Sequence, residues 1–131
     1  MENVEFKEWL VLNEARYGNY CGPGPKLNKD CSALDNGEPL PAPINSIDAI
    51  CQNHDISYCK CKANWKNSVL GHTGTPCSRG ADKIMQGDLE MTIPKLSGSE
   101  KFYANLMLTY FKSHEKIQNF QQPPQPPFAL A

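Results

Sequence analysis

The stretch Asn45-Ser46-Ile47-Asp48-Ala49-Ile50-Cys51-Gln52-Asn53-His54-Asp55-Ile56-Ser57-Tyr58 reads as an amphipathic helix. Its buried stripe follows the i, i+3, i+4, i+7 spacing and contains Ile47, Ile50, Cys51, His54, Tyr58 and Cys61. Four of these six are ordinary core residues, whereas the His54 imidazole and the Tyr58 hydroxyl need partners if they are buried. Asp55 is turned about 100° from His54 around the helix. A base, His54, and a carboxylate, Asp55, can therefore point into one cleft from the same helix. The alternative is that His54 is a core histidine and Asp55 a surface aspartate.

A glycine-rich loop precedes this helix. Its sequence is Tyr17-Gly18-Asn19-Tyr20-Cys21-Gly22-Pro23-Gly24-Pro25, with three glycines and two prolines. Glycine permits positive φ and close backbone approach, while proline stiffens the path between glycines. Such a loop can turn several carbonyl oxygens toward one point, as a hard cation such as Ca²⁺ requires.

A second helix is predicted from about Ser78 to Ile93, ending before Pro94. Its apolar stripe contains Met85, Leu89 and Ile93, and Asp82 lies on the same stripe. A carboxylate that faces a core is costly unless it is paired. We therefore predict that Asp82 and His54 are partners across two antiparallel helices.

The remaining segments are predicted to support these two helices. Residues 4–16 look helical and carry Trp9 and Leu10, which dock on the core or touch a membrane surface. Residues 26–43 are polar and rich in turn signals, so we expect an ordered or semi-ordered excursion that Cys31 ties to the rest of the fold. Residues 68–76 are predicted to be a loop, and residues 99–119 a last helix that serves as packing cover.

The ends of the central helix also carry signals. Asn45 is a good N-cap, and Asp48 three residues later fits both reciprocal capping and the positive end of the helix dipole. The helix is expected to end between Cys61 and Lys66. One domain over residues 1–120 is predicted, followed by a proline-rich tail or linker at 121–131.

The composition excludes some functions. The chain has 131 residues with 13 basic and 14 acidic side chains, which argues against a nucleic-acid partner held by bulk electrostatics. It contains no apolar run of membrane-spanning length, and its acidic first residues do not resemble a signal peptide. The six cysteines predict either a disulfide framework or, from Cys51, His54, Cys59 and Cys61, a zinc site.

The loop, the His54-Asp55 pair and the downstream Asp82 together resemble the phospholipase A2 superfamily over roughly residues 17–89. The calcium loop of that family is similar to Tyr20-Cys21-Gly22-Pro23-Gly24, and its catalytic helix is similar to residues 48–58. The resemblance implies a mainly α-helical, disulfide-braced fold with two antiparallel catalytic helices and a glycine-rich calcium loop. It also implies a calcium-dependent hydrolase acting on the sn-2 ester of glycerophospholipids.

The resemblance also assigns roles. Ca²⁺ would be held by the backbone carbonyls of Tyr20, Gly22 and Gly24 and by the carboxylate of Asp55, an oxygen-only shell. His54 would be the general base that activates a water molecule, and Asp82 would accept the other ring N–H of His54. Tyr58, one turn beyond His54, would donate its hydroxyl to Asp82. No serine or cysteine nucleophile is required.

Within the superfamily, the chain most resembles the phospholipase domain of parvovirus minor capsid proteins. The similar segments are residues 20–24, Leu34-Asp35-Asn36-Gly37-Glu38-Pro39, Pro43-Ile44-Asn45 and Ala81-Asp82. This resemblance implies a virion protein that breaches an endosomal membrane, with a phospholipid surface and the rest of a capsid polypeptide as partners. The alternatives are a secreted invertebrate phospholipase and a catalytically silent module that binds lipid or protein.

The resemblance bears on the cysteines as well. Cys21 and Cys51 stand where secreted animal enzymes bridge the calcium loop to the catalytic helix, which implies a Cys21–Cys51 disulfide. Antiparallel packing of the two catalytic helices makes Cys61–Cys77 plausible, which would leave Cys31 with Cys59. The exchange of Cys59 for Cys61 stays open.

Overall fold

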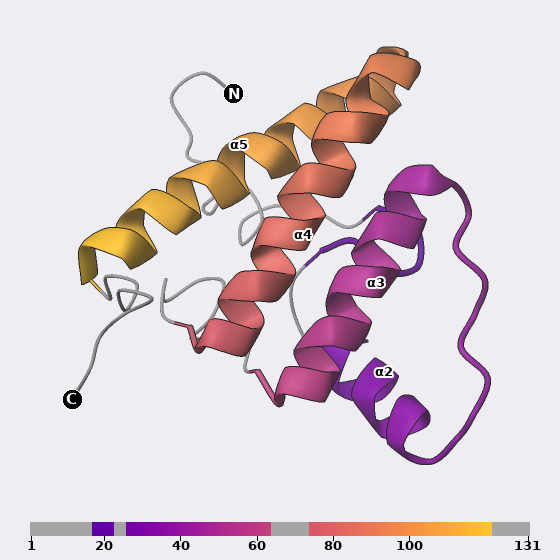
Figure 1. The fold of residues 1–131 in the computed structure, drawn as a ribbon. Coiled ribbons are helices and arrows are strands. Elements are labelled where there is room, and N and C mark those ends of the chain that lie inside the picture. The colour runs from indigo at the N-terminus through magenta and orange to yellow at the C-terminus, as the bar shows by residue number, and fades with distance from the viewer. Residues whose placement is uncertain (1–16, 23–25, 64–73, 122–131) are drawn as a thin grey trace.

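A computed structural model describes residues 17–22, 26–63 and 74–121. This part of the chain is mainly helical and confirms the predicted fold class (Figure 1). Its elements are the α-helices α2 (Lys26–Asp35), α3 (Ser46–Cys61), α4 (Pro76–Thr92) and α5 (Gly98–Gln121) and the 3-10 helix η2 (Ile93–Lys95). The predicted helix at 4–16, most of the predicted loop at 68–76 and nearly all of the 121–131 tail lie outside the described residues. The boundary predicted after residue 120 stays a prediction.

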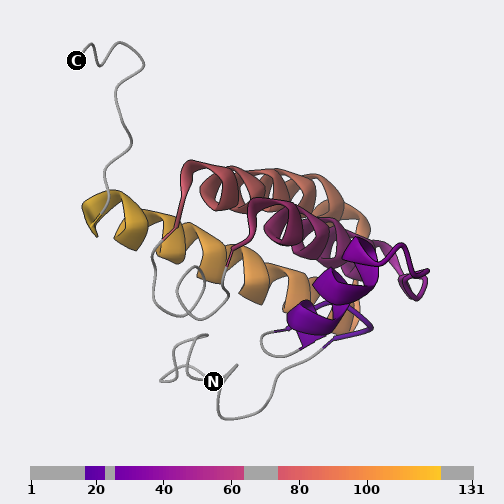
Figure 2. The same cartoon turned by 90° about the horizontal axis from the view of Figure 1, so that it is seen from below.

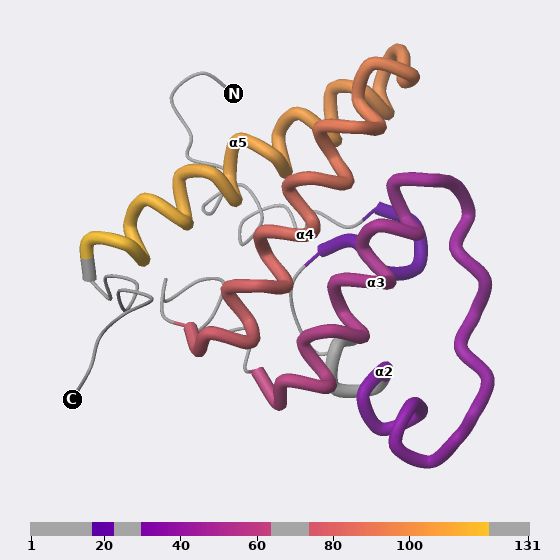
Figure 3. Tube along the Cα trace, in the orientation of Figure 1, coloured from indigo at the N-terminus to yellow at the C-terminus, as the bar shows by residue number. Residues whose placement is uncertain are grey.

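Helices α3 and α4 lie side by side and run in opposite directions, and α5 packs across them (Figures 1 and 2). The tube in Figure 3 shows how the chain descends along α3 and returns along α4. The buried faces of the three helices meet in one core whose members include Ile47, Leu89 and Phe111. Among the described residues, no helix is both long and apolar enough to cross a membrane.

The ends of α3 follow the sequence signals. The Asn45 side chain accepts a hydrogen bond from the Asp48 N–H at 3.0 Å, so Asn45 is the predicted N-cap. The helix ends at Cys61, within the predicted range, and Lys62 adopts the left-handed conformation with φ 54°. The N–H of Ala63 then bonds the carbonyl of Tyr58 at 3.0 Å, which satisfies one of the last helical carbonyls.

Helix α4 begins two residues earlier than predicted. Thr75 and Ser78 form a capping box, in which the Thr75 side chain accepts from the Ser78 N–H and Ser78 Oγ accepts from the Thr75 N–H. Pro76 occupies the first turn, where its missing N–H costs nothing. The α-helix ends at Thr92, and Pro94 lies in the 3-10 turn that follows.

The sequence analysis predicted no helix within residues 26–43, but Lys26–Asp35 forms α2. Leu27, Ala33 and Leu34 are good helix formers, and the turn signals at Asn36 and Gly37 end this helix instead of making an open loop. Gly37 has φ 70°, and the Glu38 N–H bonds the Ala33 carbonyl at 2.8 Å. Cys31 then ties α2 to α3 through a disulfide to Cys59.

Three disulfides brace the fold, and each has one cysteine in α3. They join Cys21 to Cys51, Cys31 to Cys59 and Cys61 to Cys77, so the preferred pairing is confirmed and the exchange of Cys59 for Cys61 does not occur. Because all six cysteines are oxidised, none can supply a thiolate to zinc. The zinc alternative is therefore wrong.

Candidate active site

The imidazole of His54 and the carboxylate of Asp82 meet between α3 and α4. His54 Nε2 lies 2.7 Å from Asp82 Oδ1, and both side chains are buried. The structure thus brings together the two polar residues that each interrupt an apolar helix face. Because Nε2 is engaged by Asp82, Nδ1 is the ring nitrogen that can receive a proton from a water molecule.

Tyr58 completes the hydrogen bonding of the same carboxylate oxygen. Its hydroxyl donates to Asp82 Oδ1 at 2.6 Å, and its ring lies 4.2 Å from the His54 ring, centroid to centroid. Burial and the negative charge of Asp82 raise the pKa of Tyr58 far above its ordinary value. The hydroxyl therefore stays protonated at neutral pH and remains a donor to Asp82.

Helix α5 contributes two aromatic rings beside this pair. Phe111 meets the His54 ring edge-on with a centroid distance of 5.3 Å, and Tyr110 meets Phe111 in the same manner. Both are buried. An apolar wall on one side of His54 limits the conformations open to the imidazole, so the ring is held by packing as well as by Asp82.

The sequence analysis missed His114. This residue of α5 is fully buried, and its Nδ1 lies 3.6 Å from Asp82 Oδ2, whereas His54 contacts Oδ1. The residues 99–119 were interpreted as packing cover only. The signal was present, because His114 follows Met107 and Tyr110 on the buried stripe at helical spacing and is a polar member of an apolar face, as His54 is in α3.

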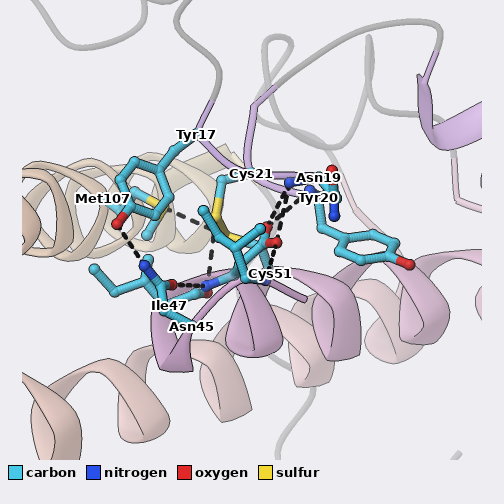
Figure 4. The surroundings of a disulfide bond; sticks show 10 residues. Tyr17, Asn19, Tyr20, Cys21, Asn45, Ile47, Cys51 and Met107 are labelled. Atoms are coloured by element: carbon cyan, nitrogen blue, oxygen red, sulfur yellow. Dashed lines mark hydrogen bonds between the residues drawn. A yellow bond between two sulfur atoms is a disulfide. The ribbon is translucent and has the colours of Figure 1, made fainter. Parts of the chain in front are cut away.

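Three of the four predicted metal-binding residues belong to the loop before α3, and the fourth, Asp55, directly follows His54 in α3. Tyr20 and Gly22 belong to a tight turn in which Tyr17 and Cys21 exchange two backbone hydrogen bonds, of 3.0 and 3.1 Å. The Cys21–Cys51 bridge fastens this turn to α3 (Figure 4). Asp55 follows Cys51 by one helical turn. Gly24 lies outside the described residues.

These residues suit a hard cation. Burial raises the pKa of Tyr20, a hydrogen bond with Gln52 partly opposes this rise, and the negative charges of nearby aspartates, including Asp55, add to it. Gly22 has φ 122°, a backbone conformation that glycine adopts readily and that residues with a side chain rarely adopt. Within the described residues, no cluster of three or more His, Cys, Asp or Glu side chains can hold a metal ion. A shell of backbone carbonyls with one carboxylate needs no such cluster, and its oxygen donors match calcium.

Asp48 differs from its predicted role. Its carboxylate does not close a reciprocal cap on the Asn45 N–H, but accepts the N–H groups of Asn19, Tyr20 and Ile44 at 2.9–3.0 Å. The reason is tertiary, because the loop folds over the first turn of α3 and presents its own donors there. Asp48 therefore joins the loop to the helix.

Comparison with known proteins agrees with this arrangement. A family model described as a phospholipase A2-like domain matches residues 12–113, which include the loop, α3 and the whole of α4. No curated protein and no solved structure gave a significant match to the chain.

Proposed function

The chain belongs to the phospholipase A2-like domain family, and we propose that it is a calcium-dependent phospholipase A2. It would hydrolyse the sn-2 ester of glycerophospholipids to a fatty acid and a lysophospholipid. The observation that carries the proposal is the 2.7 Å contact between His54 Nε2 and Asp82 Oδ1. This contact leaves the other imidazole nitrogen to act as a base toward water.

His54 would act first as base and then as acid. Its Nδ1 takes a proton from water while the water oxygen forms a bond to the sn-2 carbonyl carbon. The imidazolium then returns the proton to the glycerol oxygen as the ester C–O bond breaks, which balances the reaction. Asp82 stabilises the imidazolium, and Tyr58 fixes the position of Asp82. General base catalysis of this kind contributes roughly 10²–10⁴ in rate.

Four residues would hold the metal ion. They are Tyr20, Gly22 and Gly24, through backbone carbonyls, and Asp55, through its carboxylate. When bound, Ca²⁺ would supply positive charge beside the ester oxygen that becomes negative during attack. The Gly22 N–H is a further donor for that oxygen. The cysteines take no part as nucleophiles, since all six form disulfides.

The test is hydrolysis of phosphatidylcholine vesicles whose two acyl chains are distinguishable by mass. We expect release confined to the sn-2 chain and lost when a chelator removes calcium. His54→Gln should abolish release without unfolding the protein. Asn53→Gln is the matched control, because Asn53 is the exposed neighbour of His54 on the same helix. Its activity should equal that of the wild type.

Three outcomes would contradict the proposal. Hydrolysis that does not depend on calcium would show that the metal takes no part in the reaction. Activity that survives His54→Gln would show that His54 is not the general base. Binding to calcium and vesicles without any lysolipid would indicate the silent binding module instead.

The biological setting is also a proposal. The resemblance favours a capsid protein that breaches an endosomal membrane, and a secreted enzyme is the alternative. Three disulfides suit an oxidising environment, which both settings offer. Locating the natural open reading frame discriminates between a capsid protein and a secreted enzyme. A signal peptide directly upstream and no capsid sequence downstream would reject the capsid proposal.

A further inference from the structure

The carboxylate of Asp48 is fully buried at the junction of the loop and α3. It accepts the Asn19 N–H with both oxygens at 3.0 Å, the Tyr20 N–H at 2.9 Å and the Ile44 N–H at 2.9 Å. All of these donors are backbone groups. One side chain thus joins the loop, the residue before the N-cap and the first turn of α3.

Helix capping alone does not account for this burial. A carboxylate near the start of a helix benefits from the helix dipole while it stays exposed to water. Burying the charge costs free energy unless hydrogen bonds replace its hydration. Here the loop supplies that replacement, so the position of the loop and the burial of Asp48 depend on each other.

The backbone of the loop is shaped for this contact. Gly18 has φ 61°, and a Cβ atom at this position would lie 2.5–2.7 Å from the three carboxyl atoms of Asp48. Any side chain at residue 18 would therefore collide with the carboxylate, besides meeting an unfavourable backbone conformation. The glycine allows the loop to close over Asp48.

These contacts hold three consecutive peptide planes. Asp48 binds the N–H of Asn19 and of Tyr20, and the next N–H, of Cys21, bonds the Tyr17 carbonyl at 3.1 Å. In a planar trans peptide the carbonyl points opposite to the N–H that shares its plane. The direction of the Tyr20 carbonyl is therefore set by the bond of the Cys21 N–H, within a turn that Asp48 anchors to α3.

We propose that Asp48 is a positioning residue for the metal loop. It sets the loop at a fixed place on α3, with Asp55 two turns, or roughly 10 Å, further along the same helix. The carbonyls of Tyr20 and Gly22 are then preorganised relative to the Asp55 carboxylate before a cation arrives. This inference rests on the proposed calcium-dependent function and adds a residue that does not touch the metal.

The experiment is calorimetric titration of calcium into the full chain, without lipid. Asp48→Asn places an amide where the loop needs an acceptor, and we expect calcium to bind roughly 10–100-fold more weakly, the usual range for groups that orient metal ligands. Gly18→Ala keeps the carboxylate but crowds it, so it should weaken binding in the same direction. The turnover number at saturating calcium should fall by a smaller factor than the affinity, because neither change touches His54.

Thr75→Ala is the matched control. It also removes a side-chain acceptor from a helix N-terminus, in α4 and away from the loop. We expect its calcium affinity to equal that of the wild type. An equal loss of affinity in Thr75→Ala and Asp48→Asn would show a general effect of stability and overturn the proposal.

Amide hydrogen exchange in metal-free protein gives a second readout. The N–H groups of Asn19 and Tyr20 should exchange faster in Asp48→Asn, while those in the middle of α5 stay protected. A folded Asp48→Asn with wild-type affinity and wild-type exchange would overturn the positioning role but leave the proposed function intact. A wild-type protein that binds no calcium would overturn both the positioning role and the proposed function. If Asp48→Asn fails to fold, the same measurements on Gly18→Ala test the positioning role.

Discussion

Two of the buried aspartates, Asp48 and Asp82, have opposite surroundings. Asp48 in α3 receives hydrogen bonds from backbone N–H groups of a loop, whereas Asp82 in α4 receives them from the side chains of His54 and Tyr58. Backbone donors cannot gain or lose protons, so Asp48 is suited to hold a fixed geometry. An imidazole can exchange a proton, so Asp82 is suited to stabilise a charge that appears and disappears. Burial of the same residue type therefore leads to anchoring at one end of α3 and to chemistry in the middle.

The two regions also differ in covalent support. The Asp48 region is fastened by the Cys21–Cys51 bridge, which joins the loop to α3 beside the anchored turn. The Asp82 region relies on the packing of α4 and α5 and on the Cys61–Cys77 bridge at the far end of the helix pair. If the comparison holds, substitutions at the two regions will affect different measurements.

The largest effect is expected for Asp82→Asn. The amide cannot stabilise an imidazolium as a carboxylate does, so the turnover number should fall by roughly 10²–10⁴, the range for a general acid–base contribution. Calcium affinity measured by calorimetry should stay close to that of the wild type. A variant that lost calcium affinity and kept turnover would reverse the comparison.

The double substitution Cys21→Ser with Cys51→Ser tests the covalent support of the Asp48 region. Opening this bridge, whose cysteines are 30 residues apart, should lower the free energy of unfolding by about 3 kcal/mol in urea titrations. Calcium affinity should fall as well, because the loop loses its tie to α3. Opening Cys31–Cys59, which spans 28 residues, is the matched control and should cost similar stability without changing calcium affinity.

Tyr58→Phe tests how firmly Asp82 is held. The substitution removes a hydrogen bond to a buried charged acceptor, which is worth about 1.5–3 kcal/mol of stability. Turnover should fall less than in Asp82→Asn, since His54 keeps its partner. Tyr103→Phe removes the hydroxyl of another buried tyrosine, one that stacks on Tyr17 near the loop, and it should leave turnover unchanged. Equal losses of turnover in the two variants would contradict the role given to Tyr58.

The smallest effect is expected for Glu115→Gln on the solvent side of α4 and α5. The hydrogen bond from the Lys83 ammonium lowers the pKa of Glu115, burial partly opposes this shift, and a hydrogen bond from Gln86 lowers the pKa further. Because the folded-state pKa is depressed, the stabilisation is present above the ordinary carboxyl pKa of 4.5 and is lost as pH falls through the folded value. The variant should therefore lose about 0.2–1 kcal/mol at pH 7, and thermal unfolding in acid should show no difference from the wild type. Calcium binding and turnover should not change.

Local patterns were sufficient for the helices that carry the proposed site. Asn45 marked the start of α3, the stripe through Ile50, His54 and Tyr58 marked its buried face, and Asp82 stood out as the polar member of the α4 stripe. Each signal depends on the periodicity of one helix or on a cap of a few residues, so it can be read without knowing the fold. Helix α2 was missed because strong turn residues after Asp35 outweighed a short helical run.

The contacts between distant segments required the three-dimensional arrangement. Asp48 looked like a capping residue, since sequence spacing cannot show that Asn19 and Tyr20 fold back over the first turn of α3. His114 looked like packing, since its approach to Asp82 depends on how α5 crosses α4. The resemblance made the Cys21–Cys51 bridge an expectation, but only the packing of α2 against α3 decided between Cys59 and Cys61 as the partner of Cys31.

The sequence by itself determined the helical fold class, the candidate base, its carboxylate partner and the candidate metal loop. Each of these can be predicted from the spacing and the chemistry of residues that are close in sequence. The tertiary structure alone decided how the loop is anchored, which of Cys59 and Cys61 pairs with Cys31 and what surrounds Asp82. Those features arise where elements far apart in the chain come within hydrogen-bonding distance, and residue order does not specify such distances.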